Sequence, residues 1–239
     1  MRTPTLLCIA TVAFRQSTGQ APRCFDELRG AGAMSAAQHS AVVRGEPALF
    51  TVDRPDYRWP QVCVYQFIAA APEASVAVLT DYPLRPSYLP DVRESNVVPA
   101  TSDSAVKRIA YVIHVIARMT EADTLREAVH SLAGQFAGGY RLDWHMINST
   151  MASSVDGSAT FIPWRNDATG VAGTLMIYDQ SVEPSSRLAS LPFIKGRGID
   201  AVRNTARAIA RQVESETSRQ PSQLQRQIAD LRRGLARTP

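Results

Sequence analysis

The sequence predicts an α+β fold, in which a series of β-strands is followed by helices at the C-terminal end. Residues 62–68 alternate β-branched and aromatic side chains, which suit the pleated surface of a strand. A second alternating segment, 140–148, places four large apolar residues on one face: Tyr140, Leu142, Trp144 and Met146. Between positions 199 and 213, apolar residues recur every three or four positions, as in an amphipathic helix.

The composition is that of a globular protein with a modest basic excess. The chain has 239 residues, enough for one domain with a substantial core plus extensions, and 45% of them are hydrophobic, which argues against wholesale disorder. Its formal net charge is +4, and arginines concentrate in the last third. No stacking aromatics accompany these arginines, so we expect no nucleic-acid partner. A solvated basic helix face, or peripheral contact of the basic C-terminal region with an anionic membrane, explains the charge.

Residues 1–33 form a leader with two interpretations. Met1-Arg2 and the apolar run 6–14 resemble the start of a signal peptide, although no cleavage site is evident. Alternatively, translation starts at Met34 and the leader has no structural role. The first interpretation predicts an exported or periplasmic protein and the second a cytoplasmic one. In both cases we exclude the leader from the prediction of the fold.

The three cysteines, Cys8, Cys24 and Cys63, contain no C-x-x-C pair that would indicate a zinc or redox site. Cys63 lies in the first core strand, where we expect a buried, unpaired side chain. A disulfide between Cys24 and Cys63 is the alternative.

Turn and helix signals separate the predicted strands. Pro72 and Glu73 open a short helix, and a proline-rich turn follows at 81–91. The segment 123–133 has helical spacing but is also compatible with a strand. Asp156-Gly157 predicts a β-hairpin turn. The other strands are predicted at 48–52, 93–99, 106–118, 158–164 and 171–182.

The C-terminal region is predicted to hold two helices. The first lies within 188–217, and Pro221 in the segment 218–222 ends it. A tail helix over 223–236 carries an apolar stripe that can dock on a partner or on the chain's own domain: Leu224, Ile228, Leu231 and Leu235. Gly196-Arg197-Gly198 is expected to be a flexible entrance to the first helix, with residues 190–198 as a mobile gate.

Several motifs resemble the START-like superfamily, which includes polyketide cyclases, aromatases and coenzyme Q-binding proteins. They are Ala71-Pro72-Glu73, Asp81-Tyr82-Pro83, Tyr88-Leu89-Pro90-Asp91, Glu94-Ser95-Asn96-Val97-Val98 and the closing run from Gly157 to Pro184. The resemblance implies a helix-grip fold, a curved antiparallel sheet wrapped around a long C-terminal helix with an apolar cavity between them. It favours a strand at 123–133. The implied domains are an extension at 34–58, the START-like domain at 59–217 and the tail at 218–239.

Eight residues are candidates for the cavity wall, although each one can instead simply fill the core. They are Tyr88, Tyr111, His114, Trp144, Met146, Phe161, Met176 and Tyr178. Tyr88 is included because the corresponding turn often shapes the pocket mouth in START-like proteins, and for His114 we favour a core position. Asp143 and His145 share a strand face, where a solvated surface is a better explanation than a general base. No pattern of histidines indicates a metal, and we expect no cofactor.

Three functions are compatible with these observations. The leading hypothesis is a monomer that binds a hydrophobic small molecule, such as a lipid, isoprenoid or polyketide, for carriage or sequestration. The alternative is a cyclase or aromatase that acts in the same cavity with Tyr111, His114 and Tyr178 as polar groups. A third is an interaction protein that uses the tail helix.

Overall fold

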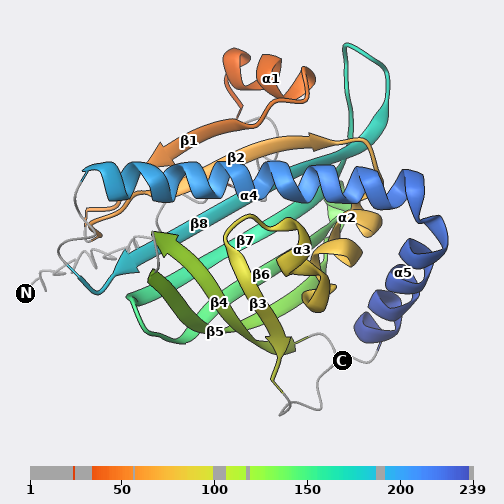
Figure 1. The fold of residues 1–239 in the computed structure, drawn as a ribbon. Helices are drawn as coiled ribbons and strands as arrows, with labels where there is room; N and C mark the ends of the chain where they lie inside the picture. The colour runs from red at the N-terminus through yellow and green to blue at the C-terminus, as the bar shows by residue number, and fades with distance from the viewer. Residues whose placement is uncertain are drawn as a thin grey trace, which may run out of the picture.

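One antiparallel sheet of eight strands organises the chain (Figure 1). The computed structural model describes Cys24 and residues 34–55, 57–98, 106–116, 119–186 and 192–236. The strands are β1 (Ala48–Val52), β2 (Gln61–Ile68), β3 (Val92–Val97), β4 (Val106–Ile116), β5 (Met119–Ser131), β6 (Tyr140–Ser149), β7 (Ala152–Arg165) and β8 (Ala172–Pro184). The helices are α1 (Ala36–Val43), α2 (Pro72–Leu79), α3 (Arg85–Tyr88), α4 (Pro192–Arg219) and α5 (Pro221–Leu235), with short 3₁₀ turns η2 (Tyr82–Leu84) and η3 (Gly134–Phe136).

The strands lie in the order β1-β2-β8-β7-β6-β5-β4-β3. This order results from one long connection between β2 and β3 and a meander from β3 to β8. After β2 the chain passes through α2, η2 and α3 to reach β3 at the far edge of the sheet. It then returns strand by strand until β8 pairs with β2. The long helix α4 runs across the front of this curved sheet, and α5 folds down beside it (Figure 1). This arrangement confirms the predicted α+β, helix-grip architecture.

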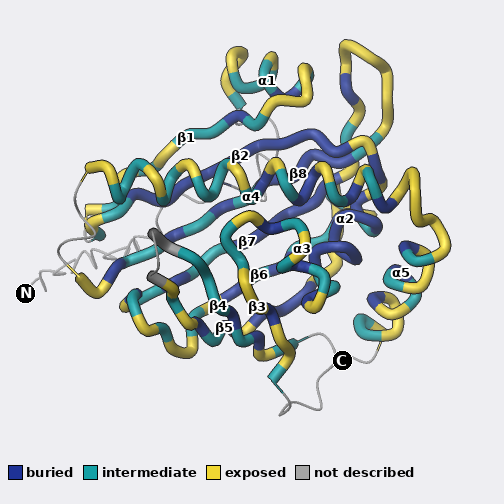
Figure 2. Tube along the Cα trace, viewed as in Figure 1, coloured by how far each residue is buried: buried dark blue, intermediate teal, exposed yellow. Residues whose placement is uncertain are grey.

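The two faces of the sheet carry separate cores. The inner face, covered by α2, α4 and α5, holds the larger one, including Val64, Ile109, Phe161 and Met176. The outer face is covered by α1 and packs a smaller core around Tyr65, Leu175 and Ile177. Strand β2 is therefore buried on both faces along its whole length, as the dark tube in Figure 2 shows.

A disulfide joins Cys24 to Cys63 on the outer face. The expectation that Cys63 is unpaired is wrong, and Cys24 contributes to the fold although it lies in the leader. Both cysteines are buried, and the hydroxyl of Tyr65 donates a hydrogen bond to the backbone carbonyl of Cys24 at 3.3 Å. A chain that began at Met34 would lack Cys24 and would leave Cys63 without this partner.

The ambiguous segment 123–133 belongs to strand β5, as the resemblance implied. It lies between β4 and β6 and pairs with both. Its side chains alternate, so that Asp123, Leu125 and Glu127 share the inner face. Tertiary pairing therefore outweighs the helical spacing of its apolar residues.

The predicted hairpin turn at Asp156-Gly157 is wrong, because these residues lie in the middle of β7. The turn between β6 and β7 occurs instead at positions 150–151, where the Ser149 hydroxyl accepts hydrogen bonds from the amides of Met151 and Ala152. Gly157 has a packing role: a Cβ atom there would lie only 2.6 Å from the indole of Trp144. The absence of a side chain, rather than turn formation, explains this glycine.

Helix α4 begins at Pro192, so Gly196, Arg197 and Gly198 lie inside the helix and are not a loop before it. Gly198 faces the ring of Trp59, which leaves no room for a Cβ atom. The described part of the proposed gate, residues 192–198, is therefore helical.

The tail helix α5 docks on the chain's own domain. Leu224, Ile228 and Leu231 of its apolar stripe are buried in the inner core. Arg232 also forms a bidentate ion pair with Glu73 at the start of α2, with distances of 2.6 and 2.7 Å. Of the two docking modes left open by the sequence, the structure has the internal one.

We expect Gly157→Ala to destabilise the fold by about 1–3 kcal/mol, because the added Cβ would overlap the backbone carbonyl of Asp179 and the ring of Trp144. The matched control is Gly196→Ala, where a Cβ meets nothing within 4 Å and helix propensity favours alanine by up to about 1 kcal/mol. Urea unfolding measures both free energies. Equal unfolding midpoints for the two variants would show that Trp144 does not restrict position 157.

Candidate functional site

Strand alternation determines which predicted residues lie on the inner face. Cross-strand pairs place Tyr111 opposite Asp123, Trp144 opposite Gly157, and Phe161 opposite Met176. Tyr178 pairs with Ala159 on one side and Val64 on the other. These residues therefore share one surface, the one that faces α2, α3 and α4.

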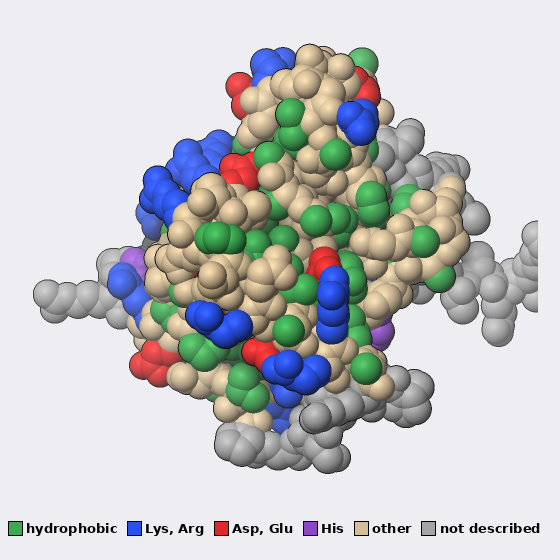
Figure 3. Space-filling model, turned by 90° about the vertical axis from the view of Figure 1, so that its right-hand side faces the viewer, with side chains coloured by type: hydrophobic (Ala, Val, Ile, Leu, Met, Phe, Trp, Pro, Cys, Tyr) green, Lys and Arg blue, Asp and Glu red, His purple; other side chains and the backbone are tan. Residues whose placement is uncertain are grey.

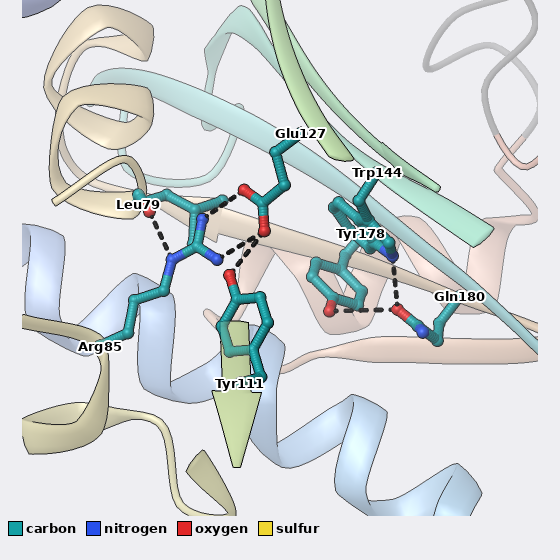
Figure 4. A network of polar contacts seen from close by, with 7 residues as sticks. All are labelled: Leu79, Arg85, Tyr111, Glu127, Trp144, Tyr178 and Gln180. Atoms are coloured by element: carbon teal, nitrogen blue, oxygen red, sulfur yellow. Dashed lines mark hydrogen bonds and ion pairs between the residues drawn. The ribbon is translucent and has the colours of Figure 1, made fainter. Parts of the chain in front are cut away.

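A buried ion pair between Arg85 and Glu127 lies on this surface (Figure 4). The guanidinium of Arg85 contacts both carboxylate oxygens of Glu127 at 2.8 Å, and its Nε donates to the carbonyl of Leu79 at 2.8 Å. The hydroxyl of Tyr111 donates to the same carboxylate at 2.5 Å. Both charged side chains are at least 95% buried, so the pair is stable only because its geometry is bidentate and its other polar atoms are satisfied.

Local sequence explains how Arg85 reaches this position. Pro83 and Pro86 end α2 and restrict the chain to η2 and the short helix α3, which turns Arg85 back toward the end of α2. There its guanidinium lies over the rings of Tyr82 and Tyr111, with centroid distances of 4.6 and 5.5 Å. Burial raises the pKa of Glu127, and the Arg85 guanidinium opposes that rise.

A second polar group lies next to this pair (Figure 4). The indole Nε1 of Trp144 donates to Oε1 of Gln180 at 3.1 Å, and the Tyr178 hydroxyl reaches the same oxygen at 3.5 Å. The rings of Trp144 and Tyr178 are in contact, with centroids 5.2 Å apart. Burial raises the pKa of the Tyr178 phenol, so this residue stays a neutral hydrogen-bond donor.

Burial is uneven across the inner face. Val64, Ala159 and Met176 surround Tyr178 and are fully buried, whereas Tyr178 itself is only half-buried. Other half-buried residues around the inner core are Tyr88, Ile113, Met146, Val182 and Val202. In α4, buried residues begin only at Ala206, and Phe193 is 62% exposed. The N-terminal half of α4 therefore covers the sheet less closely than the C-terminal half does.

Two further carboxyl groups lie on the inner face of β5, near its start. Ser149 donates a hydrogen bond to Glu121 at 2.7 Å, and Asp123 is buried with its Oδ1 atom unpaired in the described structure. Burial raises the pKa of Glu121 to about 7 and also raises the pKa of Asp123. These groups are six and four residues away from Glu127 along the strand.

The structure distributes the eight predicted residues over three environments. Tyr88, Met146 and Tyr178 are half-buried around the inner core, while Tyr111, Trp144, Phe161 and Met176 are buried within it. His114 lies on the face opposite to Tyr111, because the two positions differ by three along β4. The pair Asp143 and His145 does not form: Asp143 binds Arg141, and His145 contacts Asp156.

Sequence reasoning missed Arg85, Glu127 and Gln180. Arg85 stood between two prolines in an apparent turn, and Glu127 stood in a segment of uncertain type. The available signal was a glutamate at an inward position of a strand, where a charge requires a partner. The partner itself, 42 positions away, was not predictable from spacing.

A separate cleft of about 420 Å³ lies between α5 and the segment that joins α2 to η2. Its apolar floor includes Ala77, Val129 and Leu231, and its rim carries Asp81, Lys107 and Arg233. It is formed by the tail helix and is distinct from the inner-face polar groups.

We expect Arg85→Met to cost about 3–5 kcal/mol of unfolding free energy, because it leaves Glu127 buried and unpaired. Arg232→Met is the control, since it removes an equally bidentate but exposed partner of Glu73 and should cost much less, because solvent screens an exposed ion pair. Burial already raises the folded-state pKa of Glu127, and without Arg85 the largest effect that opposes this rise is gone. The protonated carboxyl group then stabilises the folded state, and this stabilisation is lost as pH increases through the folded-state pKa. Arg85→Met should thus be more stable at pH 5 than at pH 7.5. Urea unfolding of both variants at the two pH values measures these free energies. Equal losses of unfolding free energy in Arg85→Met and Arg232→Met would contradict the prediction.

No protein-family model matches the sequence, and no curated protein matches it either. Several solved structures are similar. A STAR-related lipid transfer protein from Xanthomonas axonopodis aligns with a TM-score of 0.58 and 14% identity over 70% of this chain and 93% of that one. A START superfamily protein from Mycobacterium smegmatis aligns with a TM-score of 0.51 and 15% identity, covering 65% and 97% of the two chains. Human STARD10 aligns with a TM-score of 0.52 and 11% identity over 74% of each chain. The chain therefore has the START-like, helix-grip fold.

Proposed function

We propose that the protein binds a hydrophobic small molecule, such as a lipid, isoprenoid or polyketide, between the inner face of the sheet and α4, for carriage or sequestration. The main support is that Tyr178 is half-buried in the middle of a sheet face where its neighbours are fully buried. The surrounding surface is aromatic and aliphatic with a few polar groups, which is typical of small-molecule sites.

The likeness to lipid-transfer proteins supports the same ligand class. A ligand that buries roughly 300 Å² of apolar area would gain about 7 kcal/mol before the costs of association, at about 25 cal/mol per Å². Affinity of this kind comes from desolvation and requires no reactive side chain.

A cyclase-like or aromatase-like enzyme is the second candidate, and the polar groups at Arg85, Tyr111, Glu127 and Tyr178 favour it. Such an enzyme requires a group that is free to exchange a proton with the substrate. Arg85 and Glu127 are bound to each other, however, and Tyr111 donates to Glu127. This arrangement supports binding more strongly than catalysis.

Native mass spectrometry of the full chain, purified gently from its own host, tests the proposal. We expect a discrete co-purified hydrophobic molecule on a monomeric protein, because the apolar inner face is costly to leave in contact with water. Unfolding the protein should release the adduct and allow its identification.

Release of a polyketide-like product only after incubation with a precursor would favour the enzyme. A protein that is empty on purification, and that also binds no added lipid, would contradict the proposal.

We also propose that the exposed side of α4 contacts an anionic membrane surface, where a hydrophobic ligand is exchanged. Arg203, Arg207 and Arg211 recur every four residues along the helix, and Phe193 near its N-terminal end is exposed. Figure 3, a view from the side of α5, shows Lys and Arg side chains gathered along the edge that α4 forms. None of the described helices has the length and apolarity to span a bilayer.

We expect Phe193→Ser to weaken binding to phosphatidylglycerol vesicles at least severalfold. An exposed phenyl ring that becomes buried in the bilayer interface contributes about 2 kcal/mol of binding free energy. Ile147→Ser is the control, since Ile147 is a similarly exposed apolar residue on β6. Vesicle co-sedimentation at low and high salt measures the vesicle affinity of the wild type and of both variants. High salt should weaken binding of the wild type. An equal effect of the two substitutions would argue against α4 as the contact surface.

A further inference from the structure

The hydroxyl of Tyr88 is a buried polar group that the fold leaves without a partner. Tyr88 ends α3, and its side chain packs against the inner core. Its hydroxyl oxygen is buried and has no hydrogen-bond partner within the described structure. Buried hydroxyl groups are normally paired, so an unpaired one in a candidate ligand site points to a group that the ligand supplies.

The polar groups nearby are bonded to one another and not to Tyr88. Arg85 uses its Nε on Leu79 and its two terminal nitrogens on Glu127. Glu127 accepts from Arg85 and from Tyr111. Trp144 and Tyr178 both donate to Gln180. None of the hydrogen bonds drawn in Figure 4 reaches the hydroxyl of Tyr88.

The charge balance around Tyr88 favours an uncharged ligand group. The ion pair of Arg85 and Glu127 carries no net charge. Burial raises the pKa of both Tyr88 and Tyr178, so both phenols stay neutral. The carboxyl group of Glu121 lies six residues from Glu127 along β5, roughly 20 Å away in an extended strand. The other carboxyl group that acts on Tyr88 is that of Asp81, so an anionic ligand group would enter a low-dielectric region without a counter-charge, which is strongly unfavourable.

We propose that Tyr88 anchors the polar end of the ligand by donating a hydrogen bond to an uncharged oxygen acceptor, such as a carbonyl, ester or ether oxygen. This inference rests on the proposed binding function and specifies the chemistry of the ligand. The apolar remainder of the molecule then lies against Met146, Tyr178 and Val202. Tyr88 is a binding residue in this arrangement, and no covalent step is involved.

The test compares three probes of similar length: methyl dodecanoate, tridecane delivered from cyclodextrin, and dodecanoate at pH 8. Each competes with N-phenyl-1-naphthylamine for the full-length protein, as wild type and as Tyr88→Phe. We expect the substitution to lower the affinity for methyl dodecanoate roughly three- to tenfold, because one hydrogen bond is lost. Tridecane has no acceptor, and dodecanoate keeps its ionised group in water, so the affinity of neither should change.

Tyr140→Phe is the matched control, because Tyr140 is a phenol directed toward Glu73 rather than toward the inner polar groups. It should leave the affinities of all three probes unchanged. Thermal unfolding of Tyr88→Phe should show no loss of stability, since the substitution removes an unpaired hydroxyl and no contact of the core.

Two other results are informative. The inference about Tyr88 is overturned if Tyr88→Phe leaves the affinity for methyl dodecanoate unchanged, or if it lowers the affinity for all three probes equally. The proposed binding function stands in both cases. If none of the probes nor the dye binds the wild type, the proposed binding function itself fails, and the inference fails with it.

Discussion

The buried ion pair between Arg85 and Glu127 connects the two parts of the chain that form the inner face. Arg85 comes from the proline-rich crossing between β2 and β3, and Glu127 comes from β5, in the far half of the sheet. Neither charge can stay in this environment alone, so the crossing segment is restricted to one position over the sheet. The same restriction fixes Tyr82 and Tyr88, which lie three residues before and after Arg85. The position of the candidate ligand contact is therefore a consequence of a structural charge pair.

Helix α4 combines two roles along its length. Its C-terminal half carries Ala206, Ile209, Ala210 and Val213 in the core and packs near α2 and α5. Its N-terminal half has no buried residue, although Ile199 and Val202 continue the apolar stripe. The tail helix α5 reinforces the anchored half through Leu224 and Ile228. A helix held at one end and loosely packed at the other can cover a ligand space while the fold remains stable.

The sequence predicted those features that depend on periodicity. Alternation in β6 placed Trp144 and Met146 on the correct face, and the apolar stripe of α4 identified the gripped helix. Pairings between distant residues leave no local pattern: the Cys24–Cys63 disulfide was only the alternative to an unpaired Cys63, and the Arg85–Glu127 pair was not predicted. Asp156-Gly157 misled for a related reason. Gly157 lacks a side chain where the Trp144 ring of the neighbouring strand packs, and in the sequence such a glycine looks the same as a glycine in a turn.

The protonation chemistry of the inner face argues for recognition rather than reaction. Proton transfer at neutral pH requires a group with a suitable pKa that is also free to reach the substrate. Near Tyr88, Arg85 and Glu127 are bound to each other, and burial raises the pKa of the phenols, so that they donate hydrogen bonds without releasing protons. Glu121, with a pKa raised to about 7, has a suitable value but lies far along β5 from this group and accepts a hydrogen bond from Ser149. A site that offers neutral donors in an apolar surrounding can orient a ligand by its oxygen atoms.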